Sequence, residues 1–145
     1  MTYRFGVVPS TWRSLSVEGN DAAWHDPDTD GTIHVDHSCE RTQDVPLQAL
    51  VMHLLAGFTQ RSFELEETIP FDQREARHVV VLARFDGRPV RMELFVMKKD
   101  GCVFDLGYMA VADRFGAGRA AFTEFVRGFH TIDTGSPADV RGASR

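Results

Sequence analysis

Two aspartate-glycine pairs, Asp86-Gly87 and Asp100-Gly101, interrupt a long stretch of strand-forming residues between positions 78 and 112. Such a pair favours a tight hairpin turn, because both turn positions require a positive φ. Residues 79–82 are apolar on both faces, which indicates a central strand covered above and below. The pattern therefore predicts three consecutive antiparallel strands in the second half of the chain.

Apolar residues recur at helical spacing in two places. In the first, positions i, i+3, i+4, i+7, i+8 and i+11 are Leu47, Leu50, Val51, Leu54, Leu55 and Phe58. This stripe predicts a helix that opens at Asp44 and Pro46 and stops at Gly57. The second stripe, from about residue 119 to residue 129, carries Phe122, Phe125, Val126 and Phe129. It predicts a closing helix that follows the hairpin strands.

The remaining segments are shorter strands and a tail. Residues 12–17, 22–25 and 32–39 have the composition of small strands, and residues 61–69 alternate with Phe63, Leu65 and Glu67 on one side. Residues 131–145 contain few large apolar side chains and are expected to be a disordered tail. The order predicts one α+β domain over residues 1–130, with a mostly antiparallel sheet of about six to seven strands and helices packed against it.

Charge excludes one class of function and leaves the compartment open. The net charge is −5, and the first 45 residues hold eight acids but three arginines. An acidic chain without a basic stripe does not suit nucleic acid. No apolar run approaches 18 residues, so no membrane-spanning segment is expected. The chain is either a complete cytoplasmic protein or a periplasmic or envelope protein whose export signal has been removed ahead of Met1.

Several short motifs, in this order of elements, resemble the PsbP/Mog-like fold. They are Val8-Pro9-Ser10-Thr11-Trp12, Val45-Pro46-Leu47-Gln48-Ala49-Leu50, Arg74-Glu75-Ala76, Phe85-Asp86-Gly87 and residues 122–129. The resemblance covers nearly all of residues 5–130. It implies an α+β sandwich of the kind found in photosystem extrinsic proteins, Ran-binding proteins, DcrB-like bacterial lipoproteins and the Eag chaperones of type VI secretion. It implies a binding or accessory role and transfers no particular site residue.

Two clusters of residues that can bind metals are better explained without a metal ion. Asp26, Asp28 and Asp30 are spaced like the start of a calcium loop, but the twelfth position is a histidine rather than the bidentate glutamate. A solvated hairpin turn is therefore favoured over weak calcium binding. His25, His34, His37 and Cys39 are also close in sequence. On a strand, His37 and His34 point to opposite faces, so no metal site is expected.

Cys39 and Cys102 are the two cysteines, and each is in phase with apolar neighbours on its own strand. Adjacent strands would bring them close enough for a disulfide. Export would favour a bridge, whereas a cytosolic location would favour two buried thiols.

A glycine-rich segment, residues 116–121, matches G-x-G-x-x-A between a strand and a helix. A dinucleotide site would also require a following parallel strand with an acid, and the chain ends in a tail instead. A loosened helix entry is therefore the favoured interpretation, and no cofactor is expected.

The sequence contains no G-x-S-x-G, H-E-x-x-H or P-loop pattern. We therefore expect a non-enzymatic binding or accessory protein of the bacterial cell envelope. The alternative is a cytoplasmic Eag-like chaperone that shields apolar effector segments on an apolar sheet face. The expected partner is a protein, and the candidate partner-binding surface is the locally basic hairpin with Arg77, Arg84, Arg88 and Arg91.

Overall fold

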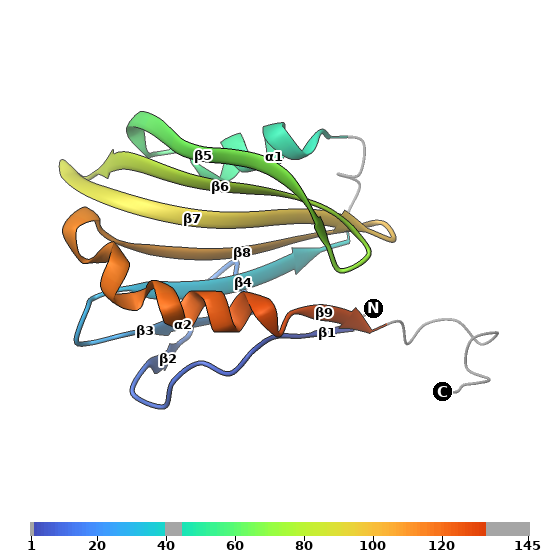
Figure 1. Ribbon diagram of the computed structural model, residues 1–145, viewed down its shortest axis with the longest axis horizontal. Coiled ribbons are helices and arrows are strands. Elements are labelled where there is room, and N and C mark those ends of the chain that lie inside the picture. Colours follow the sequence, from blue (N-terminus) through green and yellow to red (C-terminus); the bar gives the residue numbers. More distant parts are fainter. Residues whose placement is uncertain (1, 40–44, 133–145) are drawn as a thin grey trace.

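The computed structural model describes residues 2–39 and 45–132, and its main feature is a seven-stranded antiparallel sheet (Figure 1). From one edge to the other, its strands are β2 (Arg13–Leu15), β3 (Ala22–His25), β4 (Thr32–Ser38), β8 (Cys102–Val111), β7 (Arg88–Lys99), β6 (Arg74–Phe85) and β5 (Thr59–Phe71). The two aspartate-glycine pairs lie in the β6–β7 and β7–β8 turns, and all four residues have positive φ. The prediction of three hairpin-linked strands is confirmed.

The two helices lie on opposite faces of this sheet (Figure 1). We call the face under α2 (Phe115–Arg127) the inner face and the face under α1 (Leu47–Leu54) the outer face. Side chains alternate between the faces along each strand, so Phe104, Leu106 and Tyr108 pack inward. Val79, Val81, Met92, Leu94 and Val96 pack outward against α1. The α+β architecture agrees with the sequence prediction.

Helix α2 begins at Phe115, four residues before the predicted start, after a short 3-10 turn, η1 (Ala112–Arg114). The glycines at 116 and 118 therefore lie inside the helix and not in a loop before it. A Cβ on Gly118 would lie 2.5 Å from the hydroxyl oxygen of Tyr108. That hydroxyl donates a 2.7 Å hydrogen bond to the carbonyl of Phe115. The glycine at 118 thus allows the helix to approach the sheet closely, which corrects the loosened-entry interpretation.

Strand β5 departs from the simple alternation expected of it. The register between β5 and β6 shifts between Phe63 and Leu65, which pair with Val81 and Val80 respectively. As a result, Phe63 packs with the outer cluster and Leu65 with the inner one. The prediction that both lie on one side is wrong, because a bulge inserts an extra residue and reverses the faces.

A second, two-stranded sheet joins the two ends of the described chain. Strand β1 (Thr2–Arg4) pairs with β9 (His130–Ile132) beyond the end of α2 (Figure 1). Residues 131 and 132 therefore belong to a strand and not to the expected tail, while 133–145 lie outside the described residues. Within the described ranges, no helix is both long and apolar enough to cross a membrane.

The outer face is only partly covered, because within the described residues a single helix lies on it. An α-helix with its side chains is about 10–12 Å across, whereas seven strands span roughly 29 Å. Helix α1 contacts β6 and β7. Among the described residues, no helix lies over the outer faces of β8 and β4 beside it.

Candidate functional site

A groove follows the outer face of β8, and we call it the outer groove. It consists of three adjoining pockets of about 200, 140 and 240 Å³. The first two pockets share Leu54, and the second and third share Met109. The groove extends from Val103 to Val111, which are eight residue steps of about 3.3 Å, or roughly 26 Å.

The walls of the outer groove are mainly apolar. Leu50, His53 and Leu54 of α1, with Phe58 just beyond the helix, form one side. Thr32, His34 and Ser38 of β4 form the other side. Leu54 is 36% exposed, although it is a large apolar residue. Helix α1 thus presents apolar side chains both to the core beneath it and to the open groove beside it.

A histidine and an aspartate lie at the middle of the outer groove. His34 Nε2 is 3.2 Å from Asp105 Oδ2. The imidazole ring lies across Gly107, where a Cβ would be 2.1 Å from His34 Cε1. Gly107 is therefore required for this placement of the ring, because any side chain there would displace it.

Three carboxylates are close together near this part of the groove, and of the three Asp105 is the one that lines it. Asp36 and Asp105 are directly opposite each other in the β4–β8 register and share the outer face. Burial and the negative charges of Asp105 and Asp21 raise the pKa of Asp36 to about 6. Asp21 is held by hydrogen bonds with the Tyr3 hydroxyl and with His37 Nδ1. Asp36 and Asp105 therefore place negative charge on the outer face beside His34.

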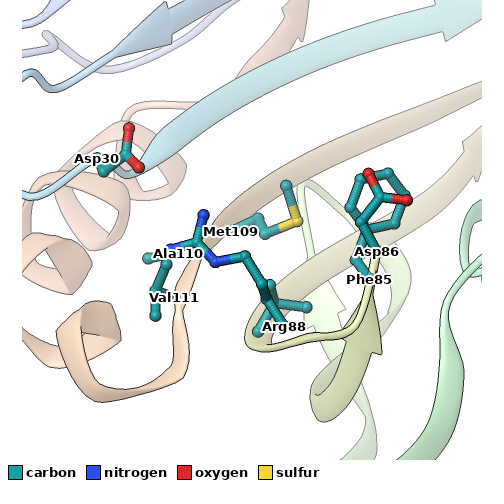
Figure 2. Close-up of a pocket in the computed structure, with 8 residues that line it drawn as sticks. Asp30, Phe85, Asp86, Arg88, Met109, Ala110 and Val111 are labelled. Carbon is teal, nitrogen blue, oxygen red and sulfur yellow. The ribbon is translucent and has the colours of Figure 1, made fainter.

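The third pocket closes one end of the outer groove (Figure 2). Val90, Met109, Ala110 and Val111 line it, together with Phe85. Its charged residues are Asp30, Asp86 and Arg88. Phe85 is 40% exposed and packs against Phe58 of the neighbouring pocket, with ring centroids 4.8 Å apart. The end pocket thus continues the apolar lining and adds the one arginine that lines the groove within residues 2–39 and 45–132.

The four arginines expected to form a partner-binding surface do not lie on one face. Arg77 shares the outer face with Val79, and Arg88 shares it with Val90, whereas Arg84 and Arg91 lie on the inner face. Three of the four are engaged within the protein. Arg77 bonds Glu66, Arg84 bonds the Gly87 carbonyl, and Arg91 bonds both oxygens of Glu64. Arg88 alone of the four has neither a hydrogen bond nor an ion pair in the described part of the chain.

A second cluster of charges lies on the inner face, away from the outer groove. His78 has Nδ1 2.6 Å from Glu67 and Nε2 2.7 Å from Glu93. Glu93 also accepts hydrogen bonds of 3.0 and 3.1 Å from Arg119 of α2. The His78 ring stacks on Phe95 at 4.0 Å. This cluster joins β5, β6, β7 and α2, which indicates a structural role.

The two cysteines are joined by a disulfide that crosses from the end of β4 to the start of β8. Cys39 follows Ser38, which pairs with Val103, so the bridge continues the register of the two strands. The sequence left a bridge and free thiols as alternatives. The disulfide links β4, which forms one side of the outer groove, to β8, which forms its floor.

The aspartates with calcium-loop spacing lie in the β3–β4 turn, as the favoured interpretation expects. Asp26 accepts hydrogen bonds from the Asp28 N–H and the Thr29 hydroxyl, and Asp30 pairs with His25 at 2.6 Å. Burial opposes ionisation of Asp26, but these hydrogen bonds lower its pKa below the ordinary value. His25, His34 and His37 are each paired with a different aspartate. Within residues 2–39 and 45–132, no group of three or more histidines, cysteines or acids is placed to hold a metal ion.

Sequence reasoning did not single out Leu54, Asp105 or Met109. A local signal exists for Asp105, the one charged residue within residues 103–110. Leu54 and Met109 fit their apolar patterns, and nothing local shows that they stay partly uncovered. Their exposure depends on how far α1 extends across the sheet.

Comparisons with known proteins show similarity at the level of the fold. No family model and no curated protein match the chain. It is similar in structure to the cyanobacterial PsbP protein CyanoP of Synechocystis, with 17% identity, coverage of 90% of this chain and 86% of that chain, and a TM-score of 0.60. It is similar to LpqN of Mycobacterium tuberculosis, described as involved in cell envelope biogenesis, with 14% identity, coverage of 91% and 85%, and a TM-score of 0.63. A protein from Bacteroides thetaiotaomicron matches with 14% identity, coverage of 92% and 46%, and a TM-score of 0.62. The resemblance to the PsbP-like fold is thus confirmed.

Proposed function

We propose, on the premise that the chain has the PsbP-like fold, that it is a non-enzymatic accessory protein that binds a segment of a protein partner in the outer groove. The segment would be apolar and would carry a basic residue. The observation that carries this proposal is the outer face of β8, which lies between α1 and β4 as a continuous, mainly apolar groove.

The dimensions of the groove favour a polypeptide over a small molecule. Each of its three pockets is smaller than the range of about 300–1,000 Å³ that is usual for small-molecule sites. The pockets adjoin over roughly 26 Å, which matches about eight residues of extended chain. A row of small apolar pockets suits alternate side chains of such a segment.

The charge of the groove favours a basic residue in that segment. Asp36 and Asp105 lie opposite each other in the strand pair, and burial together with repulsion by Asp105 raises the pKa of Asp36. A lysine or arginine of the partner placed over them would relieve this repulsion. Charge complementarity of this kind gives an interface its register and its specificity.

The polar groups of the groove support binding over catalysis. An enzyme that uses acid–base catalysis would be expected to have a deep pocket lined by a histidine and a carboxylate. His34 and Asp105 line two small open pockets instead, and the buried pair of His78 and Glu93 lies on the inner face. This arrangement supports the non-enzymatic role.

A charge placed in the groove is expected to weaken peptide binding about tenfold or more, because it opposes apolar contact. Leu54→Asp places it there, and Met52→Asp is the matched control. The two residues are 36% and 37% exposed on the same helix, but Met52 does not line the groove. The probe is a set of fluorescent peptides of about nine residues, with leucine or valine at alternate positions and a central lysine. Fluorescence anisotropy measures the affinity.

Circular dichroism establishes that both variants remain folded. If no peptide of the set binds the wild-type protein, or if both substitutions weaken binding equally, the outer groove is not the binding site.

We place the protein in the bacterial cell envelope, and the alternative is a cytoplasmic Eag-like chaperone that shields apolar effector segments. The disulfide between Cys39 and Cys102 supports the envelope, because disulfides persist in oxidising compartments. LpqN, which has a similar fold, is described as involved in cell envelope biogenesis, and this also supports a role connected with the envelope.

A thiol count on protein purified without added oxidant tests the compartment. An exported protein is expected to show no reactive thiol under denaturing conditions and two after reduction. Two reactive thiols before reduction would favour the cytoplasmic chaperone instead.

A further inference from the structure

We infer that Arg88 receives the C-terminal carboxylate of the segment bound in the outer groove, so that the protein recognises the end of its partner's chain. The inference rests on the proposed function and specifies that the bound part of the partner is the end of its chain. It is carried by the end pocket, which combines an apolar floor with an arginine that has no partner of its own among the described residues.

The state of Arg88 contrasts with that of the other arginines of the β6–β7 hairpin. Arg77, Arg84 and Arg91 each bond a carboxylate or a carbonyl of the protein. Arg88, at the start of β7, shares the outer face with Val90 and lines the end pocket. Its planar fork of donors is therefore free for an external acceptor.

The two acids of the end pocket leave Arg88 available. Asp30 Oδ1 is 2.6 Å from His25 Nε2, so that carboxylate is already paired. In Figure 2 the Arg88 side chain extends away from Asp86, toward Ala110. No ion pair joins Arg88 to either acid within the described ranges.

The surroundings of Arg88 define the class of anion. Guanidinium donors match both carboxylates and phosphates. Asp30 and Asp86 in the same pocket would repel a doubly charged phosphate more strongly than a singly charged carboxylate. Val90, Met109 and Val111 offer apolar contacts to whatever carries the anion. The pocket of about 240 Å³ thus suits a carboxylate joined to an apolar side chain.

The position of the pocket identifies this carboxylate as a chain terminus. Its lining includes Asp30 of the β3–β4 turn, Asp86 of the β6–β7 turn and Val111, the last residue of β8. These residues lie together at one end of the sheet. A segment that follows the outer face of β8 and ends at this edge would place its last residue beside Arg88, and a cation there selects the carboxyl terminus over the amino terminus.

The test compares each probe peptide as a free acid and as a C-terminal amide. The wild-type protein is expected to bind the free acid about tenfold more tightly, as is typical of a charge-assisted hydrogen bond at a partly exposed site. Arg88→Gln is expected to remove this preference, and Arg88→Lys is expected to restore it in part. Arg84→Gln is the matched control, since Arg84 lies on the same hairpin but on the inner face, and it is expected to keep the full preference.

Equal affinity for the two forms of the peptide, or a preference that survives Arg88→Gln, would overturn the inference. If binding is still weakened by Leu54→Asp in that case, the proposed function stands without it. If the peptides do not bind, or if Leu54→Asp leaves their binding unchanged, the proposed function itself fails.

Discussion

Reduction of the disulfide between Cys39 and Cys102 is expected to lower the free energy of unfolding by about 4 kcal/mol. The bridge joins residues separated by 63 positions in the chain. A link across a loop of this length removes much of the conformational freedom of the unfolded chain. Urea unfolding of the oxidised and the reduced protein, followed by circular dichroism, measures the difference.

A double variant, Cys39→Ser with Cys102→Ser, provides the control for this prediction. It is expected to match the reduced wild-type protein and to show no further change when reductant is added. An unfolding midpoint that stays constant while both thiols become reactive would show that the bridge does not stabilise the fold. Because the bridge ends the β4–β8 pair, its loss is expected to loosen the border of the outer groove before the hairpin strands.

The parts of the fold that the sequence predicts well are those defined by local pattern. The turns at Asp86-Gly87 and Asp100-Gly101 need positive φ, which few residue pairs provide, so strands β6, β7 and β8 could be placed from the chain alone. Helix α1 follows from its apolar stripe, although the structure ends the helix at Leu54, three residues before the predicted stop at Gly57. In each of these cases the signal and the structure involve neighbours in sequence.

The parts that the sequence does not predict depend on contacts between distant segments. Strands β1 and β9 have three residues each and pair from opposite ends of the described chain, so neither has a pattern of its own. The start of α2 was misplaced because glycines disfavour helices, and at Gly118 the close approach of Tyr108 overrides that preference. The bulge in β5 likewise leaves no local mark.

The candidate site shows the same division. Arg77 and Arg84 are seven positions apart on one strand, so their opposite faces follow from strand alternation and could have been predicted. The pairing of Asp36 with Asp105 joins positions 69 residues apart and requires the strand order. The outer groove itself exists because α1 packs over β6 and β7 and leaves β8 beside it, which depends on contacts between distant segments.

The charge cluster on the inner face gives the other large expected effect. Glu93→Ala is expected to lower the free energy of unfolding by about 3 kcal/mol, because it leaves the buried His78 with one carboxylate and releases Arg119 of α2. Glu66→Ala is the matched control. Glu66 also pairs with a cation, Arg77, but it is exposed, and its loss is expected to cost less than about 1 kcal/mol. Denaturant unfolding of the two variants measures both effects, and equal losses would contradict the structural role of the cluster.

The same cluster predicts how stability changes with pH. Both ring nitrogens of His78 face carboxylate oxygens, which only accept hydrogen bonds, so both must carry protons and the ring must be charged. Burial opposes this charge, but hydrogen bonds and charges of Glu93 and Glu67 outweigh it and raise the His78 pKa above 6.5. The contribution of this pKa shift to the free energy of unfolding is therefore fully present below pH 6.5. It is lost as the pH rises through the raised pKa of His78.

Burial also opposes the charge of Glu93, yet hydrogen bonds from His78 and Arg119 lower its pKa below 4.5. The stability that Glu93 contributes is lost as the pH falls through this lowered pKa. The cluster therefore stabilises the protein most between pH 4.5 and pH 6.5. The free energy of unfolding of the wild-type protein is expected to fall as the pH rises above 6.5. The His78→Gln variant lacks the titrating ring and is expected not to show this fall. A nuclear magnetic resonance titration of His78 gives its pKa directly, and a value at or below 6.5 would show that the two carboxylates do not hold the ring in its charged form.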